Sequence, residues 1–377
     1  FDAPAAELDA AADAAATLLL GARFPLVYGF ERATVEAQRI AVEIADLTGA
    51  AIDPASAAAH VLALQWIGQV TATLGEVRSR PDLVIYWGID PDSAHAGFRA
   101  RYTTPARGAP PRATFAVDVG EARGPVEVDA RFAVRAHDEI EVLWALRTRM
   151  RKRRVELLPG EAWLEPRLEE LVARLRGSRY VVVFYDACPP PSQRDPMRAF
   201  ALTALAIDAR PITRLRIIGV RRPGNAVGAE TVLAWQTGFP RAVSFGHGHP
   251  RYGPGEFTAE RLLAHGEADV ALLVTADPAR DLSPAAVAGL ERIPTIVIGE
   301  DGAWSSRSTR VRFTTPDFDA VTGSVYRMDG VPLRRRAPGV TAADTGGDAT
   351  RADVPADAAV LGRLAAAIRR CLVASSA

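Results

Sequence analysis

Two histidines separated by one glycine lie in a stretch rich in glycine and proline, SFGHGHPRYGPGEF at residues 244–257. In an extended loop the side chains of His247 and His249 could face the same way, and zinc accepts imidazole ligands. A catalytic zinc site needs a third protein ligand, and the other histidines are isolated in the sequence. The pattern therefore favours a rigid loop with polar tips, formed by His247, His249 and Arg251, over a metal site.

The other reactive side chains form no recognisable catalytic motif. Cys188 follows a strand-like run in YDACPPPS, but the prolines after it fix an extended chain and provide no helix N-terminus to lower the thiol pKa. The sequence contains no G-x-S-x-G motif and no phosphate-binding glycine motif after a strand. Asn225, between Gly224 and Gly228, offers amide groups beside a sheet edge, an arrangement compatible with a dinucleotide.

A basic run follows one helix-like segment, and it has two interpretations. It could bind a polyanion, or it could be a solvated helix C-terminus at which cations complement the helix dipole, which the pattern favours. The run consists of Arg147, Arg149, Arg151, Lys152, Arg153 and Arg154. The whole chain has 45 basic and 45 acidic residues, so its composition indicates no nucleic-acid binding.

The elements that must position these side chains alternate between short apolar strands and helix-period segments. Several predicted strands end in Gly or Asp, as strands do where they lead into ligand-facing loops of a doubly wound sheet. This alternation predicts an α/β fold with largely parallel sheets. The predicted strands are residues 25–30, 82–88, 181–186, 215–220, 270–277 and 295–301, and clear helices are residues 33–49, 138–153 and 163–177.

The number of cysteines and the length of the apolar segments indicate the cellular compartment of the protein. The two cysteines, Cys188 and Cys371, exclude a disulfide framework and favour a reducing cytoplasm. No segment approaches the roughly 20 apolar residues of a membrane span, and the acidic residues near the N-terminus argue for an amphipathic helix and against a signal peptide. We expect residues 337–377 to form a flexible linker and a closing helix in which Cys371 is buried.

Several long segments resemble the B subunit of formylmethanofuran dehydrogenase, a member of the molybdopterin oxidoreductases. The resemblance covers most of residues 12–336, and it is carried by residues 73–102, 224–256, 266–278, 293–300 and 326–336. It implies two Rossmann-like α/β domains of the formate dehydrogenase-like fold, one inserted in the other. It places the first domain at residues 1–72 plus 180–336 and the inserted domain at 73–179. In active relatives a bis-molybdopterin guanine dinucleotide lies between the domains.

The sequence departs from the active members of this family at the metal. Active relatives carry a metal-ligating cysteine directly before a His-Gly-Pro, whereas this chain has Ala59 before His60 and Val61 after it. They also carry a cysteine-rich segment for a [4Fe–4S] cluster, which ordinarily needs four thiolates. A methyl group cannot coordinate tungsten or molybdenum. The resemblance therefore implies a chain without metal or cofactor, in which the redox reaction is lost.

The narrower resemblance is to the B subunit of a formyltransferase/hydrolase complex. In that family the complex transfers a formyl group from tetrahydromethanopterin to a methanofuran-like carrier and hydrolyses it to formate. The A subunit is the hydrolase, the D subunit is the formyltransferase, and the A, C and D subunits are the implied partners. The B subunit would be a cytoplasmic scaffold with no membrane segment. Its vestigial cleft would be lined by His60, Asn225, His247, His249 and Arg251.

Two alternatives remain open at this point. An active dehydrogenase could bind tungsten or molybdenum with bis-molybdopterin guanine dinucleotide through a ligand other than cysteine, such as His60, Ser56 or Asp53. A binding module could guide the acidic polyglutamate tail of the carrier with the old cleft or with the basic run at 147–154.

Overall fold

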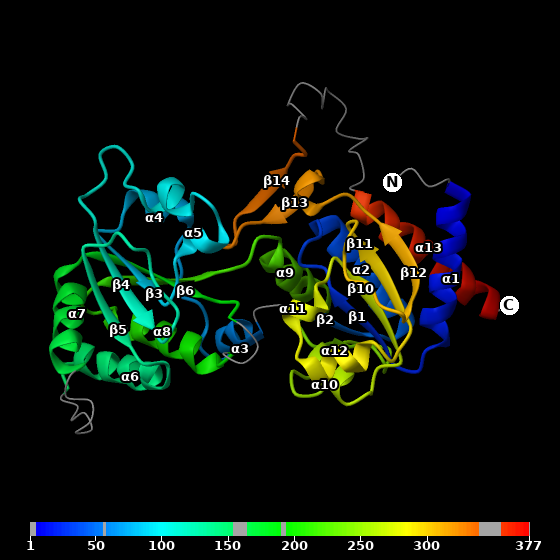
Figure 1. Ribbon diagram of the computed structural model, residues 1–377, viewed down its shortest axis with the longest axis horizontal. Coiled ribbons are helices and arrows are strands. Elements are labelled where there is room, and N and C mark those ends of the chain that lie inside the picture. Colours follow the sequence, from blue (N-terminus) through cyan, green and yellow to red (C-terminus); the bar gives the residue numbers. More distant parts are fainter. Residues whose placement is uncertain (1–4, 56–57, 154–163, 190–193, 339–355, 377) are drawn as a thin grey trace. The chain divides into compact units, whose positions relative to one another are not determined.

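The computed structural model describes residues 5–55, 58–153, 164–189, 194–338 and 356–376. It divides into two compact units (Figure 1). Unit 1 consists of Phe1–Ser56 and Gly224–Ala377, and unit 2 consists of Ala57–Pro223. Each unit contains a doubly wound sheet with helices on its faces, so the predicted α/β class is confirmed.

The seven-stranded sheet of unit 1 has the order β12-β11-β10-β1-β2-β8-β9. Strands β12 to β2 in this order are parallel, and β8 runs antiparallel to β2. The chain leaves β1 in one direction toward β2 and later returns on the other side of β1 with β10, so the strand order reverses between β1 and β10. The strands are β1 (Pro25–Gly29), β2 (Ala51–Pro54), β8 (Val243–Ser244), β9 (Arg251–Tyr252), β10 (Val270–Val274), β11 (Thr295–Gly299) and β12 (Thr309–Thr314).

Side-chain alternation along these strands builds two cores, one on each face of the sheet. Val27 of β1 belongs to the core beneath one helical layer, whereas its neighbours Leu26 and Tyr28 belong to the core beneath the other. The first layer contains α1 (Ala5–Gly21), α2 (Val35–Thr48), α9 (Ala226–Thr237) and α13 (Ala356–Ser376). The second contains α10 (Ala259–Ala264) and α12 (Pro284–Leu290), with α11 (Pro278–Asp281) beside α12.

Local sequence signals explain the ends of α2. Thr34 is its N-cap and accepts a hydrogen bond from the Ala37 N–H, and Gly49 closes it in the left-handed conformation with φ 67°, as the sequence predicts. The Asp357 carboxylate at the start of α13 accepts hydrogen bonds from the Thr34 N–H and hydroxyl, at 2.7 and 3.1 Å. The closing helix is therefore part of unit 1. Cys371, which we expected to be buried, is half-buried on it.

The sheet of unit 2 is parallel throughout, with the order β5-β4-β3-β6-β7. Here the strand order reverses between β3 and β6. The strands are β3 (Leu83–Trp87), β4 (Ala113–Val119), β5 (Ala130–Val134), β6 (Tyr180–Asp186) and β7 (Arg214–Val220). Helices α3 (Ala58–Ile67), α6 (Glu139–Met150), α7 (Glu165–Gly177) and α8 (Pro196–Ala209) share one core on this sheet.

The predicted boundaries of the inserted domain, 73–179, are too narrow. Strand β6 pairs with β3 along its length and β7 pairs with β6, so residues 180–223 complete the sheet of unit 2. Helix α3 packs on α8 and belongs to the same unit. The sequence could not show this pairing, because an apolar run indicates that a strand is buried but not which strand pairs with it.

Shorter elements complete the units. In unit 2 these are α4 (Leu74–Ser79), α5 (Pro91–Ala94), the π-helical turn Arg99–Thr103 and the 3₁₀ turn Ala136–Asp138. In unit 1 they are the 3₁₀ turn Phe318–Ala320 and the hairpin of β13 (Gly323–Tyr326) and β14 (Pro332–Arg335). Among the described helices, none combines the length and the apolar character that crossing a membrane requires.

Candidate functional site

The carboxyl ends of β1 and β10 meet where the strand order of unit 1 reverses, which is the usual ligand position in an open α/β sheet. The backbone there is tightly packed. A Cβ at Gly29, whose φ is 105°, would lie 2.5 Å from the Val274 carbonyl oxygen and 2.7 Å from the Ala276 Cβ. Phe30 and Thr275 both have positive φ angles, 53° and 48°. Backbone strain of this kind is common at functional sites, so this edge is the first candidate.

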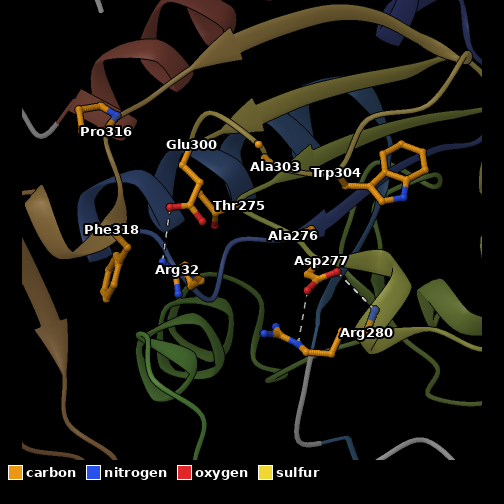
Figure 2. A pocket seen from close by; sticks show the side chains of 11 residues that line it. Arg32, Thr275, Ala276, Asp277, Arg280, Glu300, Ala303, Trp304, Pro316 and Phe318 are labelled. Atoms are coloured by element: carbon orange, nitrogen blue, oxygen red, sulfur yellow. Dashed lines mark hydrogen bonds and ion pairs between the residues drawn. The ribbon is translucent and has the colours of Figure 1, made fainter.

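A cavity of about 260 Å³ opens at this edge (Figure 2). This volume lies just below the roughly 300–1,000 Å³ of sites for drug-sized ligands, so the cavity suits a small molecule. Each of its walls comes from a loop that follows a parallel strand. The lining side chains that carry charge or aromatic character are Arg32 after β1, Asp277 and Arg280 after β10, Glu300 and Trp304 after β11, and Phe318 after β12.

The arginines at this cavity form ion pairs with nearby carboxylates. Arg32 lies 3.2 Å from Asp317 and 3.7 Å from Glu300. The hydrogen bond between the two carboxyl groups raises the pKa of Glu300 and lowers the pKa of Asp317, so Glu300 takes up a proton first. Arg280 lies 3.1 Å from Asp281 and 3.9 Å from Asp277. The arrangement can hold a small polar molecule by hydrogen bonds.

No motif in the sequence singles out Arg32, Glu300 and Asp317. A signal was present, because Glu300 lies at the end of the strand predicted at 295–301 and the carboxyl ends of parallel strands share one edge. The partner residues Arg32 and Asp317 are far away in sequence, and only the sheet order brings them to Glu300.

Unit 2 has a corresponding cavity of about 320 Å³ at the carboxyl ends of β3 and β6. Its charged lining includes three arginines, Arg123, Arg221 and Arg222, and two carboxylates, Asp90 and Asp186. Burial raises the pKa of Asp186, whose carboxylate accepts a hydrogen bond from the Cys188 N–H at 2.8 Å. The Cys188 side chain is buried, as expected for an inert thiol rather than a reactive one.

His60 is packed inside unit 2. Its Nδ1 and the hydroxyl of Tyr185 are hydrogen-bonded to each other, and the ring centroids are 5.7 Å apart. Burial, and to a smaller extent the charge of Arg221, hold the pKa of His60 well below its usual value, so the imidazole is neutral. Gly219 on β7 makes room for the ring, because a Cβ there would lie 3.0 Å from the His60 Cε1. The adjacent Ala59 is half-buried.

Asp53, an alternative metal ligand in the sequence analysis, has both carboxylate oxygens occupied. It accepts hydrogen bonds from Arg241 at 2.9 Å and from the backbone N–H groups of Ala242 and Ala259 at 3.2 and 3.0 Å. Asp53 and Arg241 are both buried, and burial raises the pKa of Asp53. Ser56, the third alternative, lies outside the described residues.

Asn225 has a structural environment in unit 1. Its side-chain amide donates to the Ala33 carbonyl at 2.9 Å, and its side-chain oxygen accepts from the Tyr326 N–H at 2.7 Å. Its backbone carbonyl accepts from the Gln38 amide. The residue is fully buried and ties the loop after β1 to α9 and β13. Its polar atoms therefore serve the fold of unit 1.

The histidine loop lies at the other edge of the unit 1 sheet. Ser244 at the end of β8 pairs with Ala51 at the start of antiparallel β2, so residues 245–250 sit by the amino ends of the parallel strands. The His247 and His249 rings are exposed, with centroids 6.4 Å apart, and Arg251 lies over the Phe257 ring at 5.7 Å. The structure does not bring these three residues to the cavity of unit 1.

The basic run at 147–154 is partly neutralised where the structure describes it. Arg147 and Arg151 both pair with Asp208, at 2.8 and 2.5 Å. Arg149 is buried and pairs with Glu165, at 2.6 Å, and with Glu169. Arg154 lies outside the described residues. Within the described ranges, no three His, Cys, Asp or Glu side chains lie together in a way that could hold a metal ion.

Comparison with known proteins gives a consistent result. No protein-family model matches the chain. The chain is 30% identical over 342 residues to the B subunit of the tungsten-containing formylmethanofuran dehydrogenase 2 of Methanocaldococcus jannaschii, covering 88% of this chain and 78% of that protein. It is 30% identical over 279 residues to the B subunit of the formyltransferase/hydrolase complex Fhc of Methylorubrum extorquens, covering 73% of this chain and 74% of that protein.

A solved structure is similar over nearly the whole chain. It is the X-ray crystal structure of the formyltransferase/hydrolase complex FhcABCD from Methylorubrum extorquens in complex with methylofuran. One of its chains superposes with a TM-score of 0.76 at 25% sequence identity, covering 97% of each chain. The similarity therefore spans both units.

Proposed function

The chain belongs to the family of formylmethanofuran dehydrogenase B subunits, and we propose that it is the B subunit of a formyltransferase/hydrolase complex, without a redox centre of its own. In this role it is a structural subunit for the A, C and D subunits, which transfer a formyl group through a methanofuran-like carrier and release formate. The similarity to the Fhc B subunit and to a chain of the methylofuran-bound complex supports the assignment. Its two cysteines favour a cytoplasmic location.

One observation carries the non-redox part of the proposal. Ala59 stands at the position where the resemblance places the metal-ligating cysteine, and a methyl group donates no electron pair to a metal. The next residue, His60, is buried with its Nδ1 bonded to Tyr185. Position 59 therefore provides no thiolate, and the Nδ1 of the adjacent His60 is already used within the fold.

The residues present do not fit a molybdopterin with tungsten or molybdenum. Both oxygens of Asp53 are occupied by Arg241 and backbone N–H groups, and the Nδ1 of His60 is bonded to Tyr185. An active dehydrogenase that used His60 or Asp53 as its metal ligand would need that residue to abandon these contacts, and Ser56 lies outside the described residues. We therefore derive no redox step for this chain.

Metal analysis of the assembled complex tests the proposal. The complex is purified with this chain in the B position, and tungsten, molybdenum and pterin are quantified against protein, with a tungsten-containing dehydrogenase as the positive control. We expect no stoichiometric tungsten, molybdenum or pterin in this chain, while formyl transfer and formate release proceed without an electron acceptor. Stoichiometric metal and pterin would overturn the non-redox assignment, and failure of the chain to assemble with the A, C and D subunits would overturn the assignment to the complex.

A further inference from the structure

Helices α3, α6 and α8 of unit 2 share one core on its sheet (Figure 1). They expose large apolar side chains. Trp144 on α6 is 41% exposed and Ile207 on α8 is 37% exposed. The two helices pack against each other, and α3, which carries the 53% exposed Trp66, packs on α8. Exposed aromatic side chains on adjacent helices are typical of surfaces that bind another protein.

Contacts on the same surface hold Trp144 in place. The guanidinium of Arg147 lies 4.0 Å from the centre of the Trp144 ring, and its Nε donates to Asp208 at 2.8 Å. Asp208 also pairs with Arg151 at 2.5 Å, and its own side chain is buried. The ring, the two guanidinium groups and the carboxylate therefore form a connected cluster between α6 and α8. Such pre-organisation lowers the entropy lost when an aromatic side chain is buried in an interface.

Where α6 and α8 end, the rim of this surface is positively charged. Asp208 compensates only one of the charges of Arg147 and Arg151. Arg153, after α6, and Arg210, after α8, are exposed, and neither has an acidic partner among the residues that the structure describes. A partner surface of complementary charge would place carboxylates against this rim. A nucleic acid is a poorer match, because the chain has no net charge and the cluster contains Asp208.

We propose that this surface, the Trp144 face (Trp144, Arg147, Arg151, Ile207 and Asp208), docks a partner subunit of the formyltransferase/hydrolase complex that has an apolar pocket with an acidic rim. The inference rests on the proposed function, because it identifies the surface through which the chain acts as a structural subunit. The pocket receives the Trp144 ring and the Ile207 side chain, and the acidic rim faces Arg153 and Arg210.

Truncation of the aromatic ring gives the direct test. The full-length chain is titrated with the remaining subunits of the complex, and the Kd is compared for wild type, Trp144→Ala and Trp235→Ala. Trp235, which is 59% exposed on α9 of unit 1, is the matched control. We expect Trp144→Ala to raise the Kd by about tenfold or more, as for an interface anchor, and Trp235→Ala to leave it unchanged. Far-UV circular dichroism and thermal unfolding verify that both variants fold.

Charge reversal gives a second test that does not depend on the ring. Arg153→Glu combined with Arg210→Glu changes two exposed side chains, so the fold is retained. The double variant should bind more weakly, and its Kd should rise less steeply with salt concentration than that of the wild type.

The outcomes separate this inference from the proposed function. A wild-type chain that does not bind the other subunits overturns the proposed function, and this inference with it. Wild-type binding that survives Trp144→Ala and the charge reversal unchanged overturns only the assignment of the surface. Self-association of the chain alone that Trp144→Ala abolishes assigns the face to a second copy and overturns the partner subunit as its occupant.

Discussion

At Gly219 on β7, neighbouring atoms fill the space that a side chain would occupy. A Cβ at this position would lie 2.8 Å from the Ala187 Cβ and 3.0 Å from the His60 Cε1. We expect Gly219→Ala to lower the free energy of unfolding by about 1–3 kcal/mol through overpacking. Thermal denaturation followed by circular dichroism measures the change.

The matched control for this substitution is Gly362→Ala on α13. No atom lies within 4 Å of a Cβ built at Gly362, and alanine is the better helix former. The control should stabilise the chain by about 0.5–1 kcal/mol. A Gly219→Ala variant that is as stable as the wild type, or more stable, would disprove the tight packing around the His60 ring.

The buried imidazole of His60 makes the stability of the chain depend on pH. Burial, followed by the charge of Arg221, lowers the pKa of His60 well below 6.5, the value that applies to the unfolded chain. As the pH falls, the unfolded state therefore binds this proton first. The contribution of neutral His60 is complete above pH 6.5 and decreases below it, by up to about 1.4 kcal/mol per pH unit. Urea unfolding on both sides of pH 6.5 measures the slope.

His60→Gln provides the control for the pH dependence. The substitution removes the titrating group, so the stability of the variant should fall less steeply below pH 6.5 than that of the wild type, whatever its absolute stability. Equal slopes in the two proteins would mean that His60 is not held neutral in the folded state.

Between elements, a single carboxylate joins β2 to the segment before β8 and to the start of α10. Asp53 on β2 accepts hydrogen bonds from Arg241 and from the backbone N–H groups of Ala242 and Ala259. Arg241→Met leaves this buried charge without its cation and should cost about 3–5 kcal/mol of stability, measured by urea unfolding.

A second substitution isolates the charge from the packing. Adding Asp53→Asn to Arg241→Met replaces the unpaired carboxylate with a neutral amide, so the double variant should recover part of the lost stability. A double variant less stable than Arg241→Met would show that the backbone contacts of Asp53, and not its ion pair, dominate the junction.

At the scale of the whole molecule, each unit has its own buried core. Leu364 of α13 is fully buried in unit 1, and Leu146 of α6 is fully buried in unit 2. Leu→Ala at either position removes about 2–5 kcal/mol of stability. We expect Leu364→Ala to increase amide hydrogen exchange in β1 and β10, and Leu146→Ala to increase it in β3 and β6. Mass spectrometry of peptides from the two sheets measures both, and equal increases in both units after either substitution would contradict separate cores.

Local signals in the sequence were sufficient for several features. The strand predicted at 82–88 is observed at Leu83–Trp87, and Gly49 ends α2 as predicted, because a short apolar run and a helix cap depend on neighbouring residues. That residue 59 is an alanine without a thiolate is also a property of one position, and it needs no structure. The resemblance to the B-subunit family followed from the sequence, and the comparisons confirm it.

Only the tertiary structure decided which distant residues meet. It assigned strand β6 to unit 2 through its pairing with β3, it placed Tyr185 against His60, and it put the histidine loop beside the amino end of β2. The physical reason is that sequence periodicity reports which side of an element is buried. The hydrogen bonds and contacts that bury it join residues far apart in the chain, and the sheet order that forms them is a property of the folded molecule.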